Sequence, residues 1–66
     1  DNPPWQQGDR VPADVVTQAQ EFNVTIPLGS WGRLSTLQRF ALCKLSRPGH
    51  ENRNFFPALQ EFGLVA

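Results

Sequence analysis

Few residues in this sequence suit nucleophilic or metal chemistry, because it holds one cysteine and one histidine. Cys43 falls between Arg39 and Arg47, one helical turn away on each side, and nearby guanidinium groups favour a thiolate. An exposed Cys43 would therefore be reactive, which makes a thiol redox sensor one hypothesis. Free cysteine is also among the most buried residue types, so the competing interpretation places Cys43 at the edge of the core.

His50 lies beside Glu51 in a segment whose proline and glycine are typical of a turn. One histidine and one carboxylate do not form a metal site, and a lone cysteine excludes an intramolecular disulfide and a cysteine-based zinc site. The sequence contains no phosphate-binding glycine loop, paired carboxylates or serine nucleophile elbow. We therefore predict no enzymatic activity, no metal and no cofactor, and we expect His50 to serve the turn.

Charge is unevenly distributed, although the formal net charge is zero. Residues 33–53 contain a single carboxylate, Glu51, and these basic residues: Arg33, Arg39, Lys44, Arg47 and Arg53. Such a stretch is a solvated face, a surface for an acidic protein, or a nucleic-acid contact. Because the total charge is balanced, the strong positive field typical of nucleic-acid binders is missing.

The favoured hypothesis is a small non-enzymatic accessory or adaptor domain that binds a larger protein carrying an acidic patch. Aromatic residues and arginine are enriched in interface hot spots, so we expect Trp5 or Phe56 to be the anchor. The candidate partner-binding residues are Arg39, Lys44, Arg47, Arg53, Trp5 and Phe56. Two alternatives stay open: a nucleic-acid-binding module that uses the basic residues of 33–53, and a redox sensor that uses Cys43. Self-association into a homo-oligomer is open as well.

The elements that must position these residues belong to one small domain, because 66 residues leave no room for a second core. Its large aromatic side chains are the remaining source of stability once disulfide and metal are excluded. No apolar run approaches the roughly 18 residues that a membrane span needs, and a free cysteine favours the cytoplasm. The sequence lacks methionine, so we expect a processed product or a piece of a longer protein.

The spacing of apolar residues predicts an all-α fold, a small bundle of three helices at about 12–22, 36–46 and 54–62. Residues 1–11 are expected to form an extended proline-rich arm, and residues 12–66 the single helical domain that follows it. Val15, Val16, Ala19 and Phe22 are the predicted core face of the first helix, and Phe55, Leu59 and Phe62 that of the last.

Local signals mark where these helices begin and end. Asn23 is a stop for the first helix, and residues 23–28 form an extended connector, followed by one short turn at 29–34 that Ser30 caps. Asn54 is the expected cap of the last helix and Gly63 its end. Trp5 is expected either to fold back and pin the arm or to face a partner.

The helix at 36–46 has the clearest start signal, a capping box in which Ser35 and Gln38 exchange hydrogen bonds. At 100° per residue its predicted core sector contains Leu34, Leu37, Ala41 and Leu45, flanked by Phe40 and Leu42. The predicted opposite, exposed side carries Arg39, Cys43 and Arg47.

The segment from Val24 to Leu45, VTIPLGSWGRLSTLQRFALCKL, resembles a segment of the small bacterial proteins called nitrate reductase associated proteins. In these proteins an apolar connector precedes a tryptophan, a leucine or phenylalanine three residues on, a capped turn and an arginine-bearing amphipathic helix. The corresponding residues here are Val24, Ile26, Trp31, Leu34, Ser35 and Arg39. The resemblance implies a small accessory protein and transfers no site residues.

Overall fold

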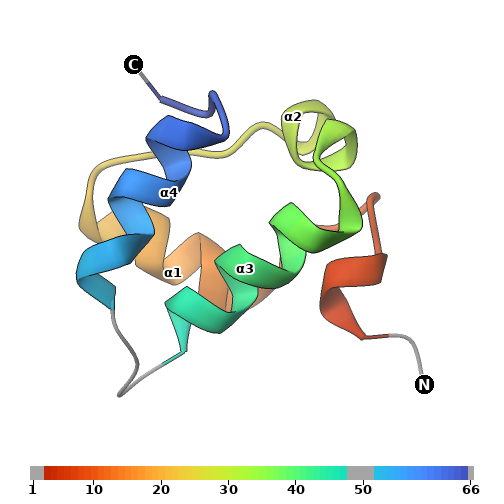
Figure 1. The fold of residues 1–66 in the computed structure, drawn as a ribbon, viewed down its shortest axis with the longest axis horizontal. Coiled ribbons are helices and arrows are strands. Elements are labelled where there is room, and N and C mark those ends of the chain that lie inside the picture. The colour runs from red at the N-terminus through yellow and green to blue at the C-terminus, as the bar shows by residue number, and fades with distance from the viewer. Residues whose placement is uncertain (1–2, 48–51, 66) are drawn as a thin grey trace.

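The computed structural model describes residues 3–47 and 52–65, and these residues form four α-helices and two short 3-10 turns without any strand (Figure 1). In chain order the elements are η1 (Pro4–Gln6), α1 (Ala13–Glu21), α2 (Leu28–Arg33), α3 (Thr36–Ser46), η2 (Asn52–Asn54) and α4 (Phe55–Glu61). The all-α prediction is confirmed, and the three predicted helices are present with ends within one residue of those expected. The turn expected at 29–34 is instead a fourth helix, α2.

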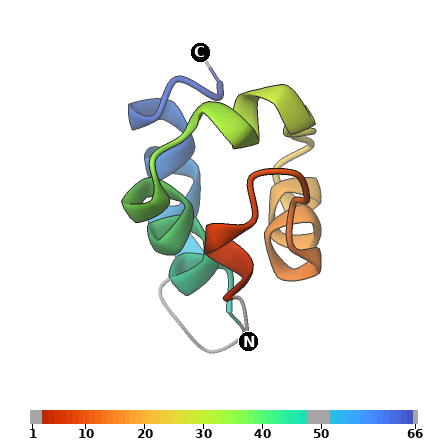
Figure 2. The ribbon, with the colours of Figure 1, turned by 90° about the vertical axis from the view of Figure 1, so that its right-hand side faces the viewer.

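Helix α3 is the central element, because α1, α4 and η1 all pack against it (Figure 1). Figure 2 shows the N-terminal arm lying across the opening between α1 and α3 and beneath α2. The arm is not extended throughout, since η1 forms a 3-10 turn within it. The buried core draws on every α-helix and consists of Val15, Ala19, Trp31, Leu34, Leu42, Cys43, Phe55, Ala58 and Leu59.

Helix α1 ends where the sequence predicts, because Asn23 adopts a left-handed backbone with φ of 59°. The amides of Asn23 and Val24 then donate to the carbonyls of Gln20 and Ala19 at 3.0 and 2.9 Å, which closes the helix end. Gly63 does the same for α4, with φ of 76° and the Leu64 amide 2.9 Å from the Leu59 carbonyl.

Two predicted core faces need correction. On α1, Val15 and Ala19 are buried, whereas Val16 and Phe22 are partly exposed because α1 is covered mainly by α3. On α4, Ala58 is buried in place of Phe62, which is half-buried against the core. The buried stripe of α1 is therefore narrower than the sequence pattern predicts, and that of α4 exchanges one residue.

The predicted helix caps are partly correct. Helix α2 begins after Pro27, whose carbonyl accepts the Trp31 amide at 3.0 Å, so Ser30 is not the cap. Proline fixes a backbone φ that leads directly into a helix, and it starts α2 earlier than the serine would. Asn54 does occupy the N-cap position of α4, without a side-chain capping hydrogen bond. The capping box of Ser35 and Gln38 is confirmed, at 3.1 and 2.9 Å.

The predicted orientation of α3 is partly wrong. Leu34 and the flanking Leu42 are buried as expected, and Leu45 packs against the core. Leu37, placed by its pattern in the core, is 75% exposed, and Arg39 and Cys43, expected on the exposed side, are buried, whereas Arg47 of that side is exposed. Elements η1, α1 and α4 pack against α3, and the carbonyls of Trp5 in η1 and of Leu34 before α3 accept hydrogen bonds from the guanidinium of Arg39. A core side assigned from the positions of apolar residues alone takes no account of these carbonyls.

Candidate functional site

Arg39 connects the arm, α2 and α3. It is only 8% exposed, its Nε donates to the carbonyl of Trp5 at 2.6 Å, and its Nη1 donates to the carbonyl of Leu34 at 2.7 Å. Hydrogen bonds from a charged donor are stronger than neutral ones, and the planar guanidinium can serve several acceptors at once. Arg39 is therefore a structural residue, and the exposed position expected for it is wrong.

The same guanidinium also lies at the C-terminal end of α2. Its Nη1 is 3.5 Å from the carbonyls of both Trp31 and Gly32, and the carbonyl end of a helix carries partial negative charge. These backbone dipoles compensate the buried positive charge. The arginine thus holds the end of α2 and the arm in one fixed arrangement.

The arm is further fixed to α2 at a close backbone approach. The indole nitrogen of Trp31 donates to the carbonyl of Gln7 at 2.9 Å. A Cβ atom added to Gly32 would lie 2.9 Å from the carbonyl oxygen of Gly8, closer than side-chain carbons come to other atoms. Glycine at position 32 therefore lets the two segments touch, and the arm packs as part of the domain.

Helix α3 presents an apolar surface to solvent on the side opposite the core. We call the outer face of α3 the surface formed by Leu37, Phe40, Ala41 and Lys44. Leu37 is 75% exposed and Phe40 37% exposed, while Ala41 is half-buried. The ring of Trp5 contacts Phe40 edge-on, with centroids 4.9 Å apart and planes at 77°. The arm thus extends this apolar surface with a half-buried tryptophan.

One exposed basic residue lies on the outer face of α3, and two more lie just before and after that helix in the chain. Lys44 lies on this face, and Arg33 and Arg47 are exposed at positions that flank α3 along the chain. The sequence from residue 22 to residue 50 contains no aspartate or glutamate. An apolar surface with a basic border is the complement of an apolar partner surface with acidic residues around it.

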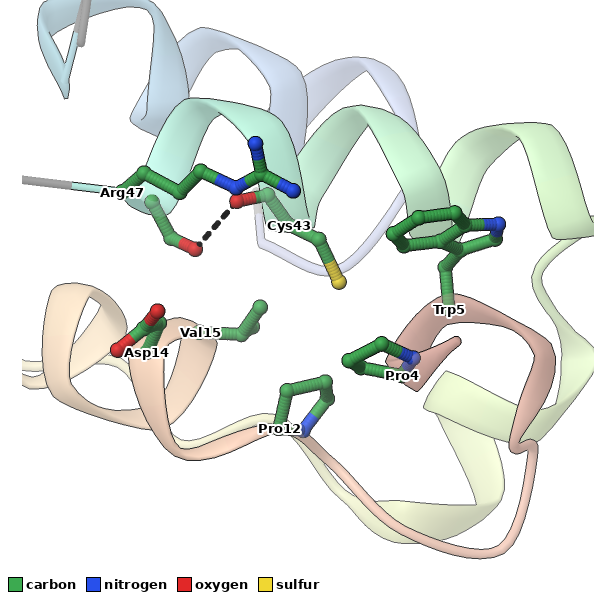
Figure 3. A pocket seen from close by; sticks show the side chains of 8 residues that line it. Pro4, Trp5, Pro12, Asp14, Val15, Cys43 and Arg47 are labelled. Atoms are coloured by element: carbon green, nitrogen blue, oxygen red, sulfur yellow. Dashed lines mark hydrogen bonds between the residues drawn. The ribbon is translucent and has the colours of Figure 1, made fainter. Parts of the chain in front are cut away.

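A cavity of about 150 Å³ lies between η1, α1 and α3 (Figure 3). It is lined by Pro4, Trp5, Pro12, Asp14, Val15, Cys43, Ser46 and Arg47. Figure 3 shows the sulfur of Cys43 pointing into it, with Asp14 and Arg47 at one end and Trp5 at the other. The hydroxyl of Ser46, which also lines the cavity, donates a hydrogen bond to the carbonyl of Cys43 at 2.9 Å.

The setting of Cys43 weighs against thiol chemistry. Burial raises the pKa of the Cys43 thiol above its ordinary value of 9.0; the positive charge of Arg47 opposes this rise, and the negative charge of Asp14 adds to it. A raised pKa keeps the sulfur as the neutral thiol at pH 7, and the thiolate is the reactive form.

The family model of the conserved nitrate reductase-associated proteins matches residues 1–62. The chain belongs to this family. No curated protein and no solved structure matches the chain. The match confirms the resemblance seen at residues 24–45 and extends it over the arm, α1 and the whole of α4. In this nitrate reductase-associated protein, three of the residues that carry the resemblance, Trp31, Leu34 and Arg39, form the contacts that fix the arm to α2 and α3.

The structure separates the sequence-predicted site residues into different places. Lys44 is exposed on the outer face of α3, Arg47 is exposed beside the cavity, and Arg53 is exposed on η2. Phe56 lies elsewhere, half-buried, with its ring 5.3 Å from that of Phe22. His50 and Glu51 lie outside the described residues.

Sequence reasoning missed Leu37 and Phe40 as surface residues of this nitrate reductase-associated protein. One signal could have found them. Lys44 follows Leu37 by seven residues, which places it about 20° away on the same side of the helix. A lysine in the middle of the predicted core sector marks that sector as exposed, because lysine is almost never fully buried.

Within residues 3–47 and 52–65, no three histidine, cysteine, aspartate or glutamate side chains come together as metal ligands would. No helix in the same ranges is both long and apolar enough to cross a membrane.

Proposed function

We propose that this protein is a non-catalytic accessory protein that docks on nitrate reductase, the larger protein after which its family is described. The contact surface is the outer face of α3, with Trp5 beside it. One observation carries this proposal: Leu37 and Phe40 are exposed side by side with Lys44 in a domain that has few apolar residues to spare.

Burial of Leu37 and Phe40 supplies the driving force for docking. Complete burial of such a side chain contributes about 1.5 to 3 kcal/mol, and a few apolar or aromatic residues carry most of the energy of an interface. A domain of this size is only marginally stable, so leaving a leucine largely in water is costly unless a partner covers it.

The basic residues around the outer face orient the complex. Lys44 and Arg47 face the acidic patch that we assign to the partner. Charges at the edge of an interface mainly raise the rate of association and exclude wrong partners. The free thiol of Cys43 agrees with a cytoplasmic setting, where thiols stay reduced.

Charge reversal tests this assignment. In the Lys44→Glu, Arg47→Glu double variant we expect association with the purified nitrate reductase of the same organism to be at least tenfold slower at low salt. The difference should shrink as salt is raised, because salt screens exposed charges. Arg10→Glu is the control, an exposed arginine of the arm that does not belong to the outer face of α3.

Two outcomes would contradict the proposal. One is binding by the double variant at the wild-type rate at every salt concentration. The other is an absence of binding to nitrate reductase in wild type together with salt-sensitive binding to DNA or RNA, which would favour the nucleic-acid-binding alternative.

A further inference from the structure

We propose that the cavity between η1, α1 and α3 receives one apolar side chain of the protein partner, presented by a segment that carries a carboxylate next to it. This inference rests on the proposed function and adds the anchor that fixes the complex. The outer face of α3 then supplies contact area, and the cavity supplies the specific position.

The size and walls of the cavity fit such an occupant. Its volume is about 150 Å³, and an apolar cavity of that size in a protein accepts a molecule as large as benzene. The walls are mainly the proline rings, the indole of Trp5, the side chain of Val15 and the sulfur of Cys43 (Figure 3). A leucine or phenylalanine side chain would make van der Waals contacts with these walls.

The cavity is continuous with the outer face of α3 through one residue. Trp5 forms a wall of the cavity and also contacts Phe40 edge-on at 4.9 Å. Arg39 holds the backbone of Trp5 through its carbonyl at 2.6 Å, so the wall is fixed before any partner arrives. A partner that covers Phe40 therefore reaches the cavity without a rearrangement of the arm.

Two charged side chains at the cavity determine how the partner segment is oriented. Arg47 belongs to the α3 side and Asp14 to the α1 side, and both are exposed. A carboxylate next to the inserted side chain is attracted to Arg47 and, further along α3, to Lys44. The same carboxylate placed over α1 is repelled by Asp14. The partner segment thus lies with its acidic residue over α3.

A reversible block of the cavity tests the proposal. Methyl methanethiosulfonate attaches a methylthio group to Cys43 through a disulfide and releases methanesulfinate, and dithiothreitol removes the group. We expect the modified protein to bind nitrate reductase at least tenfold more weakly and to regain wild-type affinity after reduction. Circular dichroism verifies that the modified domain is folded, and Cys43→Ala treated with the same reagent is the control.

A protection experiment covers the case in which modification unfolds the domain. In alkaline buffer, where the Cys43 thiol begins to ionise, bound nitrate reductase should slow its alkylation by iodoacetamide at least tenfold, because the inserted side chain covers the sulfur. Unchanged alkylation of the bound protein, or unchanged affinity of the folded methylthio protein, would overturn the cavity proposal. If charge reversal at Lys44 and Arg47 still weakened binding in that case, the proposed function would stand without the cavity. If neither the charge reversal nor the block of the cavity weakened binding, the proposed function and the cavity proposal would both be contradicted.

Discussion

Arg39 shows that a charged residue on an amphipathic helix can serve the interior. A buried arginine ordinarily pairs with an aspartate or glutamate. The guanidinium of Arg39 donates instead to backbone carbonyls of the arm, of the end of α2 and of the segment before α3. The sequence identifies a helix with an arginine on it, but the carbonyls come from residues up to 34 positions away. For that reason its role could not be predicted from local pattern.

Removal of the guanidinium should be costly. We expect Arg39→Met to lower the free energy of unfolding by about 2 to 4 kcal/mol, because the carbonyls of Trp5 and Leu34 lose charged donors. Lys44→Met, at an exposed position of the same helix, should change it by no more than about 0.5 kcal/mol. Urea denaturation followed by circular dichroism measures both values, and equal midpoints for the two variants would contradict the structural role of Arg39.

The buried thiol makes stability depend on pH in the alkaline range. Because burial raises the pKa of Cys43 in the folded state, the unfolded chain loses its thiol proton first, near pH 9.0. The contribution of the neutral thiol is therefore complete below that pH and is lost as pH rises toward the folded-state pKa. We expect the urea midpoint of wild type to fall above pH 9.0 more steeply than that of Cys43→Ala. Parallel pH profiles would show that Cys43 titrates as an ordinary thiol.

At the scale of elements, local sequence signals predicted the helix ends, whereas the apolar pattern alone misplaced part of the face that α3 buries. The capping box before α3, Asn23 after α1 and Gly63 after α4 act through neighbouring backbone atoms, so their signals are local. The face that α3 buries depends on η1, α1 and α4, which are distant along the chain. The residues of the candidate site were mispredicted for the same reason, because the pattern placed Leu37 and Phe40 toward the core and Arg39 on the surface.

The crossing of the arm over α2 gives a prediction with an internal control. Gly32→Ala should destabilise the domain by about 1 to 3 kcal/mol, because its Cβ would lie 2.9 Å from the Gly8 carbonyl oxygen and would push the arm away. Gly29→Ala, in the same helix, meets only Arg33 at 3.7 Å and should stabilise by up to about 1 kcal/mol through helix propensity. Thermal unfolding measures both variants, and a stabilising Gly32→Ala would show that the arm does not pack there.

The end of α1 gives a second prediction at this scale. Asn23 holds a φ of 59°, which asparagine tolerates and a β-branched residue does not. Asn23→Gly should leave the free energy of unfolding within about 0.5 kcal/mol of wild type, whereas Asn23→Val should lower it by about 1 to 2 kcal/mol. Urea denaturation separates the two, and equal stability of both variants would contradict the left-handed end.

At the scale of the whole molecule, the arm packs against the helical domain and its Trp5 borders the outer face of α3. Arg39 and Trp31 fix the arm, the arm places Trp5 against Phe40, and the outer face of α3 remains uncovered. The all-α fold of a sequence of this length could be predicted from the spacing of its apolar residues. The surface that we propose for docking had to come from the three-dimensional arrangement.

The affinity of nitrate reductase for a variant of the outer face tests this account most directly. We expect the Leu37→Ser, Phe40→Ser double variant, measured by titration calorimetry, to bind at least tenfold more weakly than wild type while keeping its helical circular dichroism. Leu28→Ser is the control, because Leu28 is a 51% exposed leucine on α2 that is not one of the outer-face residues, and its loss should leave affinity unchanged. Equal binding by all three proteins would contradict docking through α3.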